Sequence, residues 1–311
     1  MRETADGDLL AAFERYLINQ ALSPTTIVNY LADVRAFASW YARKEGVLRA
    51  PLTLDVGHIQ DYRDYLQTAE GRTPATINRR LQALRKFCRF AHQAGWLDAN
   101  PAAQVELLPE SKPYPPRTLS PTEVERLMEA VQEGRSSLIS RDRAILQLLL
   151  RAGLRVGELV ALRLSDVKLS SEGGILTVRG KVANARRTTT QVIGSLEPPA
   201  SVREDGTEPR QIPLDAATCQ ALRQYLSLRP SIPDDGYLFL SQRGNPISPR
   251  SVQRLVSSYA RAAGLEGVSA YVLRHTCAVT LVEENGGDLA AVARLLGCRL
   301  ETAAKYLGSS Q

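Results

Sequence analysis

The chain has 311 residues, of which 44% are hydrophobic and 23% are charged, an ordinary composition for a globular protein. This length predicts about two domains, each large enough to bury its own core. The net charge of +6 is compatible with a nucleic-acid partner, although many basic proteins bind none. No apolar run approaches the roughly 18 residues that a membrane span needs. The acidic, polar start of the chain also differs from a secretory signal. We therefore expect a cytoplasmic protein with no membrane partner.

The four cysteines and three histidines are scattered along the chain, and no two cysteines are spaced as in a CxxC pair. Zinc sites in proteins usually bring such ligands together at short, regular intervals. The sequence therefore predicts no metal site, and we expect the chemistry of the protein to need no metal and no cofactor.

Residues 1–100 are predicted to form a helical domain. Ser23-Pro24 and Thr73-Pro74 each combine an N-cap residue with a proline at the first helical position. Apolar residues at helical spacing follow both, and the two segments end at Gly46 and Gly95. A helix before Ala21 and another over residues 58–66 complete a predicted four-helix bundle.

The helix after Pro74 carries basic residues away from its apolar stripe, among them Arg79, Arg80 and Lys86. These residues are explained by a solvated helix face. They are also explained by a face that binds DNA phosphates without recognising the base sequence. We treat these three side chains as candidate DNA-binding residues.

Residues 101–118 are predicted to be an extended, proline-rich linker, with a domain boundary near residue 112. A second domain over residues 119–311 opens with a capping box at Ser120 and Glu123. It is predicted to be mostly α-helical with one small antiparallel sheet, formed by strands at 174–179 and 210–214. Residues 182–209, between the strands, are too long for a plain hairpin and are interpreted as an insertion. The predicted helices cover residues 141–152, 156–162, 216–228, 249–263, 270–284, 289–296 and 302–307.

Four short motifs follow one another in this second domain. They are GLRVGEL at 153–159, a Gly-Lys pair at 180–181 after the first strand, LRHT at 273–276, and LLG at 295–297 with Tyr306 beyond it. Their order and spacing resemble the tyrosine recombinase or phage integrase family, either Xer-like or transposase-like. The helical bundle and the proline-rich segment likewise resemble the core-binding, SAM-like domain and the hinge of that family, so the resemblance covers nearly the whole chain.

The resemblance implies an enzyme that cuts and rejoins DNA through a 3′-phosphotyrosine, with Tyr306 as nucleophile. Arg155 and Arg274 correspond to the two catalytic arginines. Their role is physically sensible, because guanidinium groups stabilise charge that accumulates on phosphate oxygens. Lys181 corresponds to the general acid that protonates the leaving 5′-oxygen. Glu158 corresponds to a supporting carboxylate that orients the arginine.

The sequence departs from the family pattern at two positions. Tyr271 stands where most members have histidine, and its hydroxyl donates hydrogen bonds but is a poor base at neutral pH. Cys298 stands where histidine or tryptophan is usual, and we expect it to be a small buried hydrophobe. His275 adjoins Arg274 but points about 100° away from it on a helix, so we expect it to pack rather than to replace Tyr271. Slower chemistry is expected.

The implied partner is double-stranded DNA, bound by a homotetramer, and no small-molecule substrate is expected. Integration, excision, dimer resolution and transposition are not distinguished. Two alternatives are open at this point. One is a catalytically weakened DNA-binding relative with an architectural or regulatory role, favoured by the loss of both histidines. The other is a topoisomerase that nicks and reseals DNA with the same chemistry.

Overall fold

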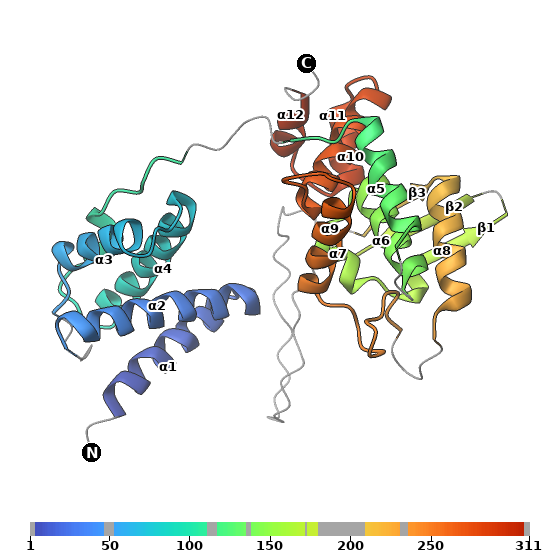
Figure 1. Cartoon of the computed structure of the whole chain (residues 1–311). Coiled ribbons are helices and arrows are strands. Elements are labelled where there is room, and N and C mark those ends of the chain that lie inside the picture. Colours follow the sequence, from blue (N-terminus) through green and yellow to red (C-terminus); the bar gives the residue numbers. More distant parts are fainter. Residues whose placement is uncertain are drawn as a thin grey trace. The chain divides into compact units, whose positions relative to one another are not determined.

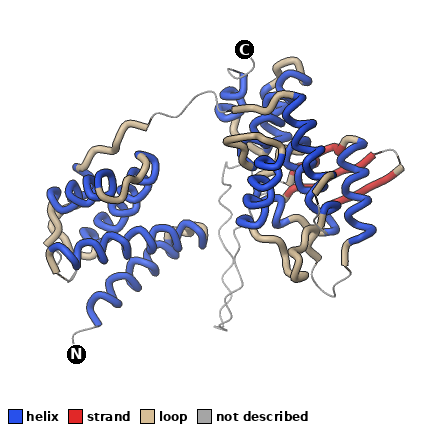
Figure 2. Tube along the Cα trace, in the orientation of Figure 1, coloured by secondary structure: helices blue, strands red, loops and turns tan. Residues whose placement is uncertain are grey.

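The computed structural model describes residues 4–46, 53–110, 117–134, 138–171, 173–179, 209–230 and 236–307. The chain divides into two compact units, Met1–Lys112 and Pro113–Gln311. Figure 1 labels their elements and Figure 2 separates helix from strand and loop. Each unit has a hydrophobic core of its own. Within the described ranges, every helix is too short or too polar to cross a membrane.

In the described part of unit 1, four α-helices form: α1 (Thr4–Asn19), α2 (Pro24–Lys44), α3 (Val56–Thr68) and α4 (Pro74–Gln93). This confirms the predicted bundle. The side chains of Ser23, Asp55 and Thr73 accept hydrogen bonds from backbone amides in the first turns of α2, α3 and α4, which explains where these helices begin. Aromatic side chains fill the core; the Phe37 and Tyr62 rings, for example, lie 5.1 Å apart edge to face.

The first part of the expected linker belongs to unit 1. A 3₁₀ turn, η1 (Pro101–Gln104), packs against α3 and α4, and Ala102 and Val105 are buried. The amide side chain of Asn78 exchanges two hydrogen bonds with the Leu108 backbone, each 2.8 Å long. The prediction of an extended linker from residue 101 therefore differs from the structure, because apolar side chains there had a core to join. Residues 111–116 lie outside the described ranges.

In the described ranges of unit 2, the α-helices are α5 (Pro121–Gln132), α6 (Ile139–Arg151), α7 (Val156–Ala161), α8 (Ala216–Leu228), α9 (Pro249–Ala262), α10 (Ala270–Glu284), α11 (Leu289–Leu296) and α12 (Leu300–Leu307). A small sheet lies at one side of these helices and contacts α8 and α11 (Figure 2). A 3₁₀ turn, η2 (Leu164–Asp166), leads into the sheet. The mostly helical fold with a small antiparallel sheet is as predicted.

The sheet has the order β1 (Val167–Ser170), β2 (Gly173–Val178) and β3 (Arg210–Leu214), with both pairs antiparallel. The sequence predicted β2 and β3 but missed β1. At four residues, β1 is too short for its alternation of polar and apolar side chains to stand out. Residues 180–208, which contain Lys181 and nearly all of the expected insertion, lie outside the described ranges.

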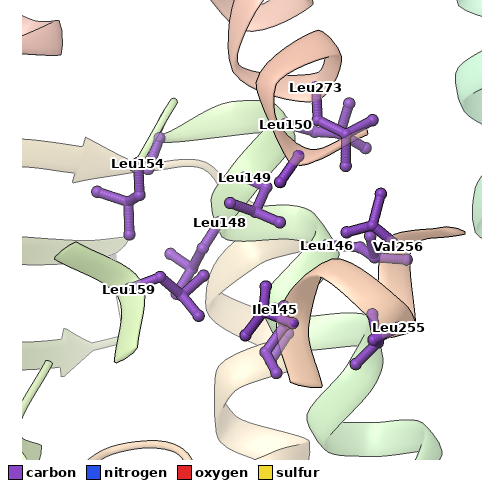
Figure 3. Packing of buried hydrophobic residues seen from close by; sticks show 14 of the residues in the cluster. Ile145, Leu146, Leu148, Leu149, Leu150, Leu154, Leu159, Leu255, Val256 and Leu273 are labelled. Atoms are coloured by element: carbon purple, nitrogen blue, oxygen red, sulfur yellow. The ribbon is translucent and has the colours of Figure 1, made fainter. Parts of the chain in front are cut away.

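The main core of unit 2 forms around α6, which contacts α5, α8, α9 and α10. Figure 3 shows leucines of α6 clustered with side chains from α7, α9 and α10, including Leu159, Leu255 and Leu273. A second hydrophobic cluster joins α10, α11 and α12 and contains Val282, Val292 and Tyr306. The C-terminal helices are therefore held by their own apolar contacts, and Tyr306 is one of them.

Candidate active site

The turn between α6 and α7 presents Arg155. Gly153 precedes it with φ at +57°, a conformation that favours glycine. A Cβ atom at Gly153 would lie only 2.6 Å from Cδ2 of Leu296 and 3.0 Å from Sγ of Cys277. Glycine therefore lets this turn pack closely on α10 and α11. Arg155 is the N-cap of α7, and 44% of its side chain is exposed.

Glu158, in the first turn of α7, is surrounded by arginines. Its carboxylate accepts hydrogen bonds from the Arg155 backbone N–H at 2.7 Å and from Nη1 of Arg155 at 2.9 Å. Arg210 donates to both carboxylate oxygens through Nη1 and Nη2, each at 3.0 Å. Nη1 of Arg274 lies 3.7 Å from Oε2. Three guanidinium groups thus share one carboxylate.

This environment decides the ionisation of Glu158. Burial raises the pKa of the Glu158 carboxyl, but the hydrogen bonds and charges of Arg210 and Arg155 outweigh burial and hold that pKa below its ordinary value. The carboxylate is therefore charged at neutral pH. Since three positive groups face one negative group, the cluster keeps an excess of positive charge.

The same three arginines also hold the C-terminal end of α11. Nε of Arg210 donates to the carbonyl of Leu295, Nη2 of Arg274 to that of Leu296, and Nη2 of Arg155 to that of Gly297, each at 2.8 Å. The last carbonyls of a helix have no partner within the helix and carry partial negative charge. Three consecutive carbonyls are thus each satisfied by a different arginine.

Arg274 is the most enclosed of the predicted arginines, with 9% of its side chain exposed. Its Nη1 donates to the carbonyl of Gly153, so Arg274 links the turn before Arg155 to the end of α11. Burial and the nearby charge of Arg155 lower the pKa of Arg274. A guanidinium nevertheless stays protonated in proteins.

Arg210 was not among the predicted site residues. It is the first residue of β3, and only 10% of its side chain is exposed. The sequence contained one signal: Arg210 stands two and four residues before Ile212 and Leu214, so all three side chains point to the same face of the strand. An arginine on the inward face of a strand requires an acidic or carbonyl partner, and Glu158 and Leu295 supply both.

Tyr306 lies on α12 and is buried in the cluster that it forms with α10 and α11. Burial raises the pKa of its hydroxyl, while the charge of Arg274 acts in the opposite direction. The hydroxyl is therefore protonated at neutral pH. Its ring centroid is 5.0 Å from that of His275.

The residues at the off-pattern positions lie around Tyr306. Tyr271 is 62% exposed and stacks on the His275 ring at 6.2 Å, so the buried His275 ring contacts both Tyr271 and Tyr306. Cys298 is half-buried, and burial raises the pKa of its thiol although three arginines nearby lower it. The thiol is therefore neutral and is a weak donor.

The other predicted residues lie elsewhere. Lys181 falls outside the described ranges; the strand before it ends at Val178, which pairs with Arg210 in the sheet. In unit 1, the half-exposed Arg79 forms an ion pair with Asp33. Arg80 is only 14% exposed and donates to Glu70 at 3.5 Å and to the Tyr62 hydroxyl at 3.3 Å. The ammonium of Lys86 lies 6.0 Å above the Tyr16 ring.

The arrangement in unit 2 suits chemistry at an anionic centre. Arg155 exposes guanidinium donors next to the buried Arg274, and Glu158 fixes both in place. The hydroxyl of Tyr306 is close enough to Arg274 and Arg155 for both charges to lower its pKa. Preorganised donors of this kind stabilise negative charge that builds up on phosphoryl oxygens during attack.

Comparisons with known proteins identify the family of the chain. Residues 117–311 match the phage integrase family, and residues 10–95 match the phage integrase N-terminal SAM-like domain. The chain is 32% identical over 300 residues to the tyrosine recombinase XerC of Pelobacter propionicus, covering 96% of this chain and 89% of the relative. It is 30% identical over 295 residues to the tyrosine recombinase XerD of Lacticaseibacillus casei, covering 93% and 89%.

Solved structures share the fold. A lambda integrase dimer bound to a COC′ core site is 19% identical, with a TM-score of 0.66 and 94% of both chains covered. The XerH site-specific recombinase bound to its difH substrate, in a pre-cleavage complex, is 20% identical, with a TM-score of 0.67, 90% of this chain and 76% of that chain covered. Since the family match spans unit 2 and the full-length relatives span both units, the chain belongs to the phage integrase family of tyrosine recombinases.

Proposed function

We propose that this family member is a site-specific DNA recombinase that cleaves and rejoins DNA strands through Tyr306. The observation that carries the proposal is the convergence of Arg155 and Arg274 on Glu158 beside a buried tyrosine hydroxyl. Such a site binds a phosphodiester and supplies a nucleophile to it.

The proposed step is a transfer of one phosphoryl group. The Tyr306 oxygen forms a bond to phosphorus as its proton passes to solvent water, and the bond from phosphorus to the 5′-oxygen breaks. The products are a 3′-phosphotyrosine and a 5′-hydroxyl. Lys181 would give the leaving oxygen its proton. Because the phosphotyrosine keeps the energy of the broken bond, the reverse attack by a 5′-hydroxyl rejoins DNA without ATP.

The other site residues have supporting parts in this proposal. Arg155 and Arg274 bind the non-bridging phosphate oxygens, and Glu158 orients them. The exposed Tyr271 hydroxyl donates a hydrogen bond to the phosphate in place of the usual histidine. His275 and Cys298 shape the pocket around the Tyr306 ring.

Double-stranded DNA is the proposed substrate, and the proposed location is the cytoplasm. The lambda integrase and XerH structures contain DNA. In unit 1, α4 is proposed to contact DNA phosphates through Arg79, Arg80 and Lys86. Strand exchange between two DNA sites requires four cleavages, for which we propose a homotetramer assembled on DNA.

Covalent trapping tests the proposal. The full chain is incubated with nicked duplexes tiled across the DNA that flanks its gene, and SDS-resistant complexes are measured, with Tyr306→Phe as the control. We expect an adduct that the control lacks. Tight binding of a duplex without an adduct would refute the enzymatic proposal, and supercoil relaxation without recombinant products would indicate a topoisomerase instead.

A further inference from the structure

Arg210 is the member of the arginine cluster to which the proposed chemistry assigns no role. Its side chain is mostly buried, and three of its nitrogens donate to protein acceptors: two to the carboxylate of Glu158 and one to the carbonyl of Leu295. Arg155, in contrast, is nearly half exposed. Arg210 is therefore bound to the protein itself, whereas Arg155 faces solvent where a phosphate can reach it.

The bonds of Arg210 join two parts of the site. Glu158 belongs to α7 and holds Arg155 and Arg274, whereas Leu295 belongs to the last turn of α11. The guanidinium also lies against Gly297, where a Cβ atom would be 2.6 Å from Nη1 of Arg210. Glycine at this helix end thus lets Arg210 approach, in addition to permitting the left-handed φ of +58°.

The end of α11 matters because the nucleophile depends on it. Cys298 follows Gly297, and Tyr306 packs with Val292 and Leu296 in one apolar cluster. A shift of this helix end would move the acceptors of all three arginines together with one wall of the Tyr306 pocket. Displacements near 1 Å far from the reacting atoms are enough to cost about 100-fold in rate.

We propose that Arg210 is a positioning residue: by joining Glu158 to the end of α11, it sets the orientation of Arg155 and Arg274 relative to Tyr306. Arg210 does not contact the phosphate. This inference rests on the proposed function, and it predicts that the effect of Arg210 on cleavage is transmitted through Glu158.

The test compares variants of the full chain by the rate of covalent complex formation at saturating protein, on the flanking-DNA duplex that traps the native chain. Arg210→Met is expected to lower this rate about 100-fold while changing the binding affinity less than about threefold, since positioning affects the reaction more than the ground state. Arg210→Lys, which keeps the charge but not the fork of donors, is expected to recover part of the loss.

Arg141→Met is the matched control. Arg141 is also buried in unit 2 and donates to a carboxylate, Asp142, and to a carbonyl, that of Leu240, at 2.9 Å. We expect it to lower stability to a similar degree without the loss in cleavage rate per folded molecule. An equal loss in both variants would show that Arg210 merely stabilises the fold and would overturn the proposal.

A double-mutant cycle with Glu158→Gln tests the route of the effect. If Arg210 acts through Glu158, the double variant is no more than about threefold slower than the slower single variant; multiplied losses would overturn the proposal.

Hydrogen exchange gives a readout that needs no cleavage: Arg210→Met is expected to increase exchange over residues 289–307. If the native chain forms no adduct, the proposed function fails, and unchanged exchange there would independently refute the role of Arg210.

Discussion

Arg79, Arg80 and Arg85 of α4 in unit 1 and the arginines around Glu158 in unit 2 all donate to protein acceptors, but the two groups differ in how those acceptors are distributed. In unit 1, Arg79 has Asp33, Arg80 has Glu70, and Arg85 donates to the carbonyls of Ala102 and Val105. In unit 2, three arginines share Glu158. The first arrangement spreads the arginines over separate partners, whereas the second concentrates positive charge.

The pKa values of the buried Asp33 and the mostly buried Glu158 shift in opposite directions. Burial raises the pKa of Asp33, and its partner Arg79 offsets only part of that effect. Burial also raises the pKa of Glu158, but its arginines outweigh burial, so that its pKa is lowered. The number of arginines that converge on one carboxylate is therefore a better indicator of an anion-binding site than the total number of arginines in a region.

The largest expected effect comes from removing an arginine of the cluster. Arg274→Met is expected to lower the rate of covalent complex formation about 1000-fold, because a preorganised donor to the phosphate is lost. Arg85→Met is the counterpart in unit 1, since Arg85 also donates to two backbone carbonyls. It is expected to change the rate at saturating protein less than about threefold. Equal losses in the two variants would contradict the distinction.

Removing the two carboxylates tests the comparison next. Glu158→Gln is expected to destabilise unit 2 by about 3 kcal/mol at pH 7, because buried cations lose their counter-charge. Asp33→Asn is expected to cost unit 1 less than about 1 kcal/mol, since the Asp33 charge is itself disfavoured by burial and Arg79 is half exposed. Urea unfolding, monitored by hydrogen exchange in each unit, measures both changes in the free energy of unfolding.

The contributions of Glu158 and Asp33 to folding stability are expected to depend on pH in opposite directions. The folded pKa of Glu158 is lowered, so its contribution to stability is present above its unfolded pKa of about 4.3 and is lost as the pH falls through the folded value. The folded pKa of Asp33 is raised, so its contribution is present below about 3.9 and is lost as the pH rises through the folded value. The free energy of unfolding of unit 2 is measured against pH for the native chain and for Glu158→Gln. An equal loss of stability at low pH in both would refute this assignment.

Adding a cation to the cluster has a smaller expected effect. Tyr271→His places an imidazole at an exposed position beside the site, and a protonated imidazole is a stronger phosphate donor than a neutral phenol. We expect the cleavage rate to rise about 10-fold at pH 6 and less at pH 8, where the imidazole is neutral. Tyr271→Phe serves as the control for loss of the hydroxyl, and an equal gain at both pH values would rule out the charge effect.

The smallest expected effect concerns α4. Lys86→Ala is expected to lower the slope of log affinity against log salt by about one, the value for one lost phosphate contact. Arg80→Met is expected to change the slope less, because that side chain is mostly buried and donates to Glu70 and Tyr62. Binding titrations from 50 to 200 mM salt measure both, and a larger slope change for Arg80→Met would identify Arg80 as the main phosphate contact.

The sequence by itself determined the features that depend on neighbours along the chain. Ser23, Thr73 and Ser120 marked helix starts, because an N-cap bonds to amides only a few residues away. The loop position of Arg155 and the helical positions of Arg274 and Tyr306 followed from local motifs. The pairing of Arg155 with Glu158 was also predictable, since Glu158 follows Arg155 by three positions, about one helical turn.

Only the tertiary structure decided which distant groups meet. Arg210 reaches Glu158 from 52 positions away, and the carbonyls of Leu295, Leu296 and Gly297 meet three arginines from different elements. The packing of residues 101–108 on unit 1 and the pairing of β1 with β2 likewise depended on available partners. Local propensity carries no information about such partners, because a buried polar group is satisfied by whatever the folded chain brings within hydrogen-bonding distance.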